Sequence, residues 1–75
     1  MTDMHIGSQI RDELHKQGRS NRWLADHIHV NMRTVNKIFL KEVIDTQRLM
    51  QISRTLGVDF FQRYSEALRD EHADM

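Results

Sequence analysis

The chain has 75 residues, a net charge of zero from 11 basic and 11 acidic side chains, and neither cysteine nor proline. This length allows one small domain without a deep catalytic cleft, because a single domain usually takes on the order of 100–200 residues. The lack of cysteine excludes disulfides and thiolate metal sites, so close helix packing or self-association has to stabilise so small a domain. No apolar run is long enough for a membrane span, and we expect a cytoplasmic protein with no membrane partner. The zero net charge argues, at first sight, against a nucleic-acid partner.

The charge is distributed unevenly along the chain. Residues 1–64 carry ten basic against seven acidic side chains (+3), whereas residues 65–75 carry one arginine against four acids (−3). Residues 19–41 alone hold five basic side chains and a single acid. Attraction to phosphate depends on this local field rather than on the sum over the chain. A solvated acidic tail beside an ordinary charged surface would give the same segregation.

Apolar residues recur at helical spacing throughout the chain, and no alternating strand pattern competes. The first stripe has a four-residue spacing and consists of Ile6, Ile10 and Leu14. Either Thr2 or Asp3 can cap the start of this helix, and Gly18 can supply the left-handed residue that ends it.

Two short helices are expected next. Ser20 is a suitable N-cap for a helix over about 21–28, and Asn31 for one that ends near Phe39. The apolar positions of this pair are Leu24, Ala25, Ile28, Val30, Val35 and Ile38. Ala25 is small enough for a close contact between two helices that cross steeply after a tight turn.

The last two helices have equally clear ends. Asp45 can cap a fourth helix that Gly57 terminates, and Asp59 with Gln62 resembles a capping box that opens a fifth. The fourth helix carries Leu49, Ile52 and Leu56, and the fifth carries Phe60, Phe61, Tyr64 and Leu68. We therefore predict an all-α fold, a compact bundle of five helices. In the connection over 40–45, we expect Val43 and Ile44 to fold back onto the core.

The outer face of the third helix is polar. It carries Asn31, Met32, Arg33, Asn36 and Lys37. Most of these are hydrogen-bonding side chains with the length needed to reach base edges in a major groove.

The run from Asn21 to Ile38 resembles the helix-turn-helix of the phage-repressor/Cro group, often called the XRE family. The flanking helices also resemble that family, so the similarity covers roughly residues 6–60. The resemblance implies a lambda-repressor-like fold with the helix-turn-helix in the second and third helices. We expect a single helix-turn-helix domain over residues 1–70, followed by a frayed acidic tail over 71–75.

The resemblance also implies which residues meet duplex DNA. The residues expected to contact the bases are Met32, Arg33, Asn36 and Lys37. Those expected to contact the DNA backbone are Arg19, Asn21, Arg22, Asn31, Thr34 and Lys41. Arg33 is the strongest candidate, because a guanidinium can bind two guanine acceptors at once, which is worth about 1–3 kcal/mol of discrimination.

Three features depart from the family pattern. His29 stands where glycine is usual, so a left-handed turn residue would carry modest strain. The low net charge predicts weak non-specific affinity and a shallow salt dependence. The connection over 40–45 lacks the usual proline.

Other chemistry has little support in the sequence. His27 and His29 could supply two metal ligands, but a zinc site needs a third and usually a fourth, so surface histidines are the better interpretation. Ser20 and Ser53 have no evident base partner, and there is no glycine-rich phosphate loop. We expect no enzymatic activity, no cofactor, no metal and no small-molecule ligand. Trp23 is expected in the core or at its rim.

The fifth helix offers a second functional surface. Phe61, Tyr64 and Leu68 could form a two-fold interface between two copies, or Phe60 and Phe61 could simply close the core. A helix-turn-helix dimer would place its recognition helices about 34–36 Å apart and read a palindromic site. The sequence thus predicts a small transcriptional regulator of bacterial or phage type, such as a repressor, that binds double-stranded DNA. The alternative is a protein-interaction module, such as an antitoxin-like adaptor, that keeps the fold and uses the Phe61, Tyr64 and Leu68 face.

Overall fold

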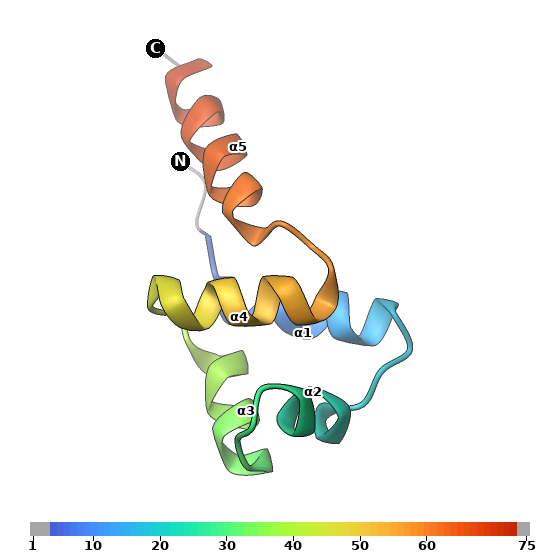
Figure 1. The fold of residues 1–75 in the computed structure, drawn as a ribbon. Helices are drawn as coiled ribbons and strands as arrows, with labels where there is room; N and C mark the ends of the chain where they lie inside the picture. The colour runs from blue at the N-terminus through green and yellow to red at the C-terminus, as the bar shows by residue number, and fades with distance from the viewer. Residues whose placement is uncertain (1–3, 74–75) are drawn as a thin grey trace.

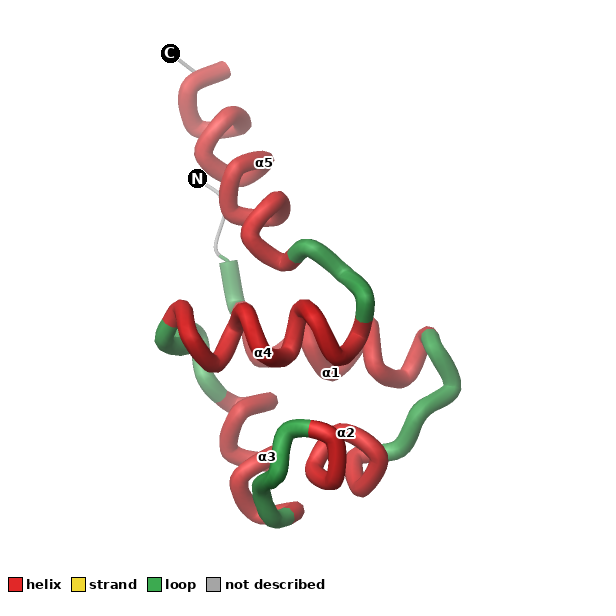
Figure 2. The backbone as a smooth tube through the Cα atoms, in the orientation of Figure 1, coloured by secondary structure: helices red, strands yellow, loops and turns green. Residues whose placement is uncertain are grey.

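The structure, a computed structural model, describes residues 4–73, which form five α-helices and no strand (Figures 1 and 2). The helices are α1 (Ile6–Lys16), α2 (Asn21–His27), α3 (Met32–Leu40), α4 (Thr46–Leu56) and α5 (Phe60–Ala73). The predicted all-α class with five helices is confirmed for these residues.

Helices α1 to α4 form the body of the molecule, and α5 stands away from it (Figure 1). In the body, α1 packs against α3 and α4, and α2 packs against α3. The projecting α5 makes the molecule elongated, with extents of 43 × 21 × 20 Å.

A single apolar core joins all five helices. Its buried members are Ile6, Ile10, Leu14, Leu24, Ala25, Ile28, Val35, Ile38, Phe39, Leu49, Ile52, Leu56 and Phe60. Helix α5 contributes only Phe60 to this set. Among the described residues, no polar or charged residue is buried, so packing of apolar side chains holds the fold together.

Most of the predicted helix ends are confirmed. The side chains of Ser20, Asn31 and Asp45 each accept a hydrogen bond from the backbone N–H three residues later in the chain. The distances are 3.1, 2.8 and 2.8 Å. Gly18 and Gly57 have left-handed φ angles of 71° and 69° after α1 and α4. Such caps satisfy backbone groups that a helix end leaves without a partner.

The start of α1 differs from expectation, whereas the start of α5 agrees with it. Helix α1 is capped by His5, whose Nδ1 accepts from the Ser8 N–H at 3.1 Å. Thr2 and Asp3, the predicted caps, lie outside the described residues. Asp59 does cap α5, with bonds of 3.0 and 3.2 Å from the N–H groups of Phe61 and Gln62.

Helix α5 continues to Ala73, past the boundary at residue 70 that the sequence suggested for the domain. Residues 71–73, which we expected to belong to a frayed tail, are therefore helical. Residues 74–75 lie outside the described part of the chain.

The connection between α3 and α4 is fastened to the start of α1. The Gly7 N–H donates to the Lys41 carbonyl at 2.9 Å, and the Ile6 N–H donates to the Glu42 carbonyl at 3.3 Å. A Cβ atom on Gly7 would lie 2.4 to 2.7 Å from three carbonyl oxygens, those of Ile38, Phe39 and Lys41. Only glycine permits so close an approach, and it fixes the end of α3 against α1.

The expectation that Val43 and Ile44 both fold back onto the core is half right. Ile44 packs against the core, whereas Val43 is 75% exposed. The chain leaves α3 in an extended conformation at Lys41 and bends at Glu42, and the carbonyls of these two residues accept from the N–H groups of Gly7 and Ile6. This attachment to α1 sets the direction in which the chain continues, and only Ile44 then packs against the core.

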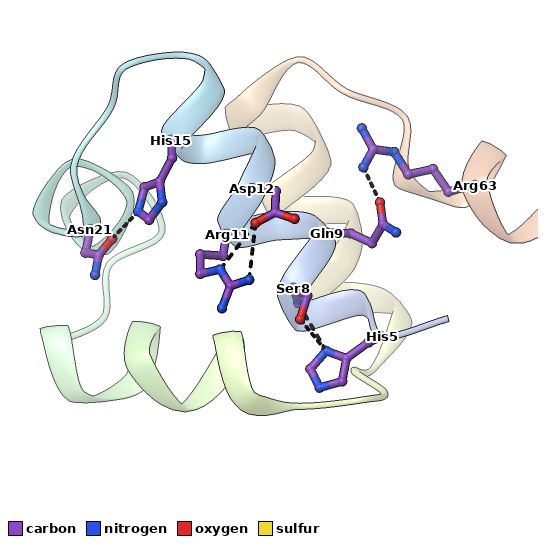
Figure 3. A network of polar contacts seen from close by, with 8 residues as sticks. All are labelled: His5, Ser8, Gln9, Arg11, Asp12, His15, Asn21 and Arg63. Atoms are coloured by element: carbon purple, nitrogen blue, oxygen red, sulfur yellow. Dashed lines mark hydrogen bonds and ion pairs between the residues drawn. The ribbon is translucent and has the colours of Figure 1, made fainter. Parts of the chain in front are cut away.

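Polar contacts connect α5 to α1 in the body. Arg63 of α5 donates to Gln9 (Figure 3) and forms an ion pair with Glu13 at 3.0 Å. The Gln17 amide donates both to Glu13, at 3.1 Å, and to the Leu56 carbonyl at the end of α4, at 2.9 Å. The hydrogen bond from Gln17, with support from Arg63, outweighs partial burial and holds the pKa of Glu13 below its ordinary value.

Candidate nucleic-acid interface

The turn between α2 and α3 is tight and braced. The Val30 N–H donates to the Ala25 carbonyl at 3.0 Å, and the Ala25 side chain is buried where the helices meet. His29 has a φ of 59°, which confirms the left-handed conformation considered for it. For a non-glycine residue, this conformation costs about 1–2 kcal/mol.

Side chains of α4 hold this turn in place. The Gln51 amide donates to the Ile28 carbonyl in the turn at 3.3 Å, and Arg48 donates to the Gln51 side-chain oxygen at 2.9 Å. Sequence reasoning missed both residues, because a contact between side chains and a backbone 23 positions away leaves no local signal. The turn is thus fixed from α4 as well as from its own hydrogen bonds.

The outer face of α3 exposes all four residues predicted to read bases. These are Met32, Arg33, Asn36 and Lys37. They fall in two pairs at four-residue spacing, which places them on one side of the helix. The opposite side of α3 carries Val35, Ile38 and Phe39, which are buried in the core.

A chain of polar contacts reaches this face from α1. The Asn21 amide donates to the Asn36 side-chain oxygen at 3.5 Å, and Asn21 Oδ1 lies 3.4 Å from His15 Nε2 (Figure 3). These long hydrogen bonds bring the start of α2 to the exposed face of α3. The His15 ring also meets the Phe39 ring edge-on, with centroids 6.5 Å apart. His15 is a third residue that sequence reasoning did not single out.

The residues predicted to contact the DNA backbone divide into two groups. Asn31 and Thr34 bond to each other, since Asn31 Oδ1 accepts from both the backbone N–H and the hydroxyl of Thr34, at 2.8 and 3.0 Å. Arg22 and Lys41 are exposed. Arg19 is also exposed, and its guanidinium lies over the ring of Trp23.

The basic side chains of this region have no acidic partner within residues 4–73. The two ion pairs there are Arg11 with Asp12, and Arg63 with Glu13. Neither pair involves the basic residues of the segment 19–41, which are Arg19, Arg22, Arg33, Lys37 and Lys41. These five cations are therefore available to an anionic partner.

The second candidate surface lies on α5. Phe61 and Tyr64 are half-buried and pack against the core, whereas Leu68 is 56% exposed. Phe61 and Tyr64 also line an apolar groove with Val43, Ile44, Thr46 and Leu49. Partial burial raises the pKa of the Tyr64 hydroxyl. Two of the three predicted interface residues thus close the core and border the groove at the same time.

Metal ligands are not clustered in the side chains that the structure describes. Residues 4–71 contain no group of three or more histidine, aspartate or glutamate side chains arranged to hold a metal ion. His27 stacks on Trp23, with ring centroids 4.0 Å apart. No helix in this part of the chain has the length and apolar character needed to cross a membrane.

Comparison with known proteins identifies no relative of this chain. No family model matches the chain, and no significant match was found among curated proteins or solved structures. The geometry of the α2–α3 region is therefore the basis for assigning a function.

Proposed function

We propose that this protein is a sequence-specific DNA-binding regulator that reads the major groove of duplex DNA with α3. In this proposal, α2 and α3 form a helix-turn-helix of the phage-repressor type. The observation that carries it is the exposed face of α3, where Met32, Arg33, Asn36 and Lys37 lie side by side.

The dimensions and chemistry of α3 suit this role. An α-helix with its side chains is about 10–12 Å across, and the major groove of B-DNA is about 12 Å wide. Helix α3 contains no acidic residue, so nothing on it repels phosphate. Arg33 can donate two hydrogen bonds to guanine, Asn36 can pair with adenine, and Met32 can pack on a thymine methyl group.

The cations around α3 would set the register on DNA. Arg19 and Arg22 lie at the start of α2, Lys41 directly follows α3, and all three are exposed, as contacts to phosphate require. They are few, and each neutralised phosphate adds only about 0.9 to the slope of log K against log salt. Binding should therefore depend weakly on salt and draw much of its specificity from base contacts.

A second copy of the chain would complete the arrangement. Two large apolar residues are left exposed here: Leu68 on α5, and Val43, which lines the groove together with Phe61 and Tyr64. Burying them in a two-fold interface would remove apolar surface from water and place two α3 helices on one duplex. The expected site is then a palindrome with half-sites about 34–36 Å apart.

Equilibrium binding to a duplex selected by the wild-type protein tests the proposal. Arg33→Ala should weaken binding about 10- to 100-fold and relax the preference at one base pair, because a bidentate contact is worth about 1–3 kcal/mol. Lys37→Ala should also weaken binding. Arg69→Ala, which removes an exposed arginine from α5, is the matched control and should bind as the wild type does. If Arg33→Ala and Lys37→Ala behave like this control, α3 does not read DNA.

The exposed apolar groove favours a second candidate function, an antitoxin-like or adaptor protein that binds another protein through Phe61, Tyr64 and Leu68. This function predicts that Tyr64→Ala and Leu68→Ala abolish activity in the cell while Arg33→Ala leaves it intact. The regulator predicts that Arg33→Ala removes activity.

A further inference from the structure

Three side chains form a stack along the outside of α2. The guanidinium carbon of Arg19 lies 3.9 Å from the centroid of the Trp23 ring. The His27 ring is stacked on Trp23 at a centroid distance of 4.0 Å and an interplanar angle of 25°. Two groups this close to one centroid cannot share a face of the ring, so Arg19 and His27 cover opposite faces of Trp23. His27 lies four residues after Trp23 on α2, the spacing of neighbouring side chains on a helix, whereas Arg19 reaches the ring from the segment before the N-cap.

The stack is fixed at its far end. His27 Nδ1 lies 2.7 Å from the carbonyl oxygen of Trp23 and donates a hydrogen bond to it. This bond orients the imidazole, which in turn limits rotation of the indole. The indole then provides a defined surface for the Arg19 guanidinium, through a cation–π contact well inside the usual limit of about 6 Å.

The hydrogen-bonding capacity of Arg19 remains unused. Within residues 4–73, its guanidinium takes part in neither a hydrogen bond nor an ion pair. The N–H donors of a guanidinium lie in its own plane, so stacking on a ring leaves them pointing outward at the edge of the stack. This fork matches two oxygens of a phosphate group.

The stack also excludes another role for Trp23. A tryptophan can bind single-stranded nucleic acid by stacking a base on an open face of its ring. Here Arg19 and His27 cover both faces. Trp23 is therefore suited to holding Arg19 rather than to contacting a base.

The position of the stack links it to the exposed face of α3. Arg19 immediately precedes Ser20, the N-cap of α2, and Asn21, whose amide reaches Asn36 on α3. Arg19 thus lies two residues before the point at which α2 reaches the face of α3 that carries Arg33 and Lys37.

We propose that Trp23 and His27 are positioning residues that hold Arg19 ready to clamp a backbone phosphate of the DNA that α3 reads. This inference rests on the proposed function. An arginine that is already ordered loses less side-chain entropy when it binds, so its phosphate contact gains in affinity.

Anisotropy of a labelled duplex, titrated at several salt concentrations, tests the clamp. Arg19→Ala should weaken binding about three- to tenfold and lower the salt slope by about 0.9, as expected for the loss of one phosphate contact. Trp23→Leu, which removes the aromatic ring but keeps an apolar side chain, should weaken binding in the same direction. Trp23→Phe retains a ring and should restore most of the affinity. Arg54→Ala, at an exposed position on α4, is the control and should leave both affinity and slope unchanged.

A double variant separates positioning from simple packing. If Trp23 acts through Arg19, Arg19→Ala should cost almost nothing further in the Trp23→Leu background, since coupled residues are not additive. Circular dichroism on each variant establishes that the helices are intact.

Each outcome has a distinct meaning. Full wild-type affinity in Trp23→Leu, or additive losses in the double variant, would overturn the clamp while DNA binding stands. A wild-type protein that binds no duplex at all would overturn the proposed function, and the clamp with it. Because Trp23 is the only tryptophan, its emission offers a second readout and should change when Arg19 engages the duplex.

Discussion

Helices α3 and α5 differ in how deeply they are buried and in how they are attached. Helix α3 buries three residues in the core, and its exposed positions carry no acid, with Met32 and Leu40 as the exposed apolar residues. Helix α5 buries only Phe60, and its outer part carries the exposed apolar Leu68 among charged neighbours. The body therefore holds α3 along its whole buried side, whereas most of α5 lies outside the core.

The attachments of the two helices explain this difference. Gly7 of α1 fastens the end of α3, and Gln51 of α4 braces the turn that leads into it. Helix α5 is attached at its N-terminal end, by the buried Phe60 and by the hydrogen bonds of Arg63 to Gln9 and Glu13. A recognition surface needs rigidity because misplaced donors lose their hydrogen bonds. An association surface instead needs exposed apolar area.

The largest expected effect on stability is at the N-terminal end of α5. Phe60→Ala should lower the free energy of unfolding by about 3–5 kcal/mol, because Phe60 is fully buried and a cavity would remain. Leu68→Ala, on the exposed part of the same helix, should change it by less than about 0.5 kcal/mol. Urea unfolding followed by circular dichroism measures both. Similar losses would show that α5 is anchored along its whole length.

The second largest effect on stability is expected where α3 is attached to α1. Gly7→Ala should cost about 3 kcal/mol, because its Cβ would lie 2.4 Å from the Ile38 carbonyl oxygen and backbone would have to move. Gly57→Ala is the matched control. Gly57 has a left-handed φ of 69° but no neighbouring atom within 4 Å of an added Cβ, so it should cost about 1–2 kcal/mol. Thermal unfolding ranks the two, and the reverse order would contradict the close approach.

The polar attachment of α5 should depend on pH. The pKa of Glu13 is lowered in the folded protein by the Gln17 and Arg63 hydrogen bonds. Its contribution to stability is therefore present above the ordinary value of 4.5 and is lost as the pH falls through the lower folded value. Glu13→Gln should cost about 1 kcal/mol at neutral pH, the size of a hydrogen bond.

Urea midpoints taken between about pH 6 and pH 3 check the pH dependence of Glu13. The wild-type protein should lose more stability over this range than Glu13→Gln does. Parallel curves for the two proteins would assign the acid sensitivity to other groups.

The smallest expected effect is a gain in stability at the turn before α3. His29→Gly should raise the free energy of unfolding by about 0.5 kcal/mol, because relief of left-handed strain exceeds the entropic cost of glycine. Thermal unfolding measures the gain. His29→Ala keeps the Cβ and gives the control, which should show no gain. A loss on introducing glycine would mean that the imidazole itself stabilises the turn.

Local features of the fold were predictable from the sequence because their causes are local. Ser20, Asn31 and Asp45 cap helices through hydrogen bonds to backbone groups three residues away. The buried stripes follow from helical periodicity. Val43 was predicted wrongly because its direction depends on how the preceding residues are tied to α1.

The candidate site was predictable in its exposed residues but not in their arrangement. Helical spacing was enough to place Arg33 and Lys37 on an outer face. The contacts that Gln51, His15 and Gly7 make with distant parts of the chain depend on tertiary packing, which local spacing does not encode. Trp23 was expected at the rim, but its stacking with Arg19 and His27 required side-chain geometry.

The zero net charge seemed at first to exclude DNA, yet the basic and acidic side chains are separated along the sequence. Five basic side chains and one acid lie in residues 19–41, which include α3, and four of the acids lie in residues 65–75. The local surface around α3, rather than the total charge, sets its attraction to phosphate.

Selection from a pool of random duplexes by the wild-type protein, in parallel with Arg33→Ala, tests the central claim most directly. Low salt, about 50 mM, strengthens phosphate contacts and favours any DNA binding. The account predicts that the wild type enriches one sequence, with a guanine whose preference Arg33→Ala loses and with half-sites about 34–36 Å apart. A wild-type pool that stays random would contradict it.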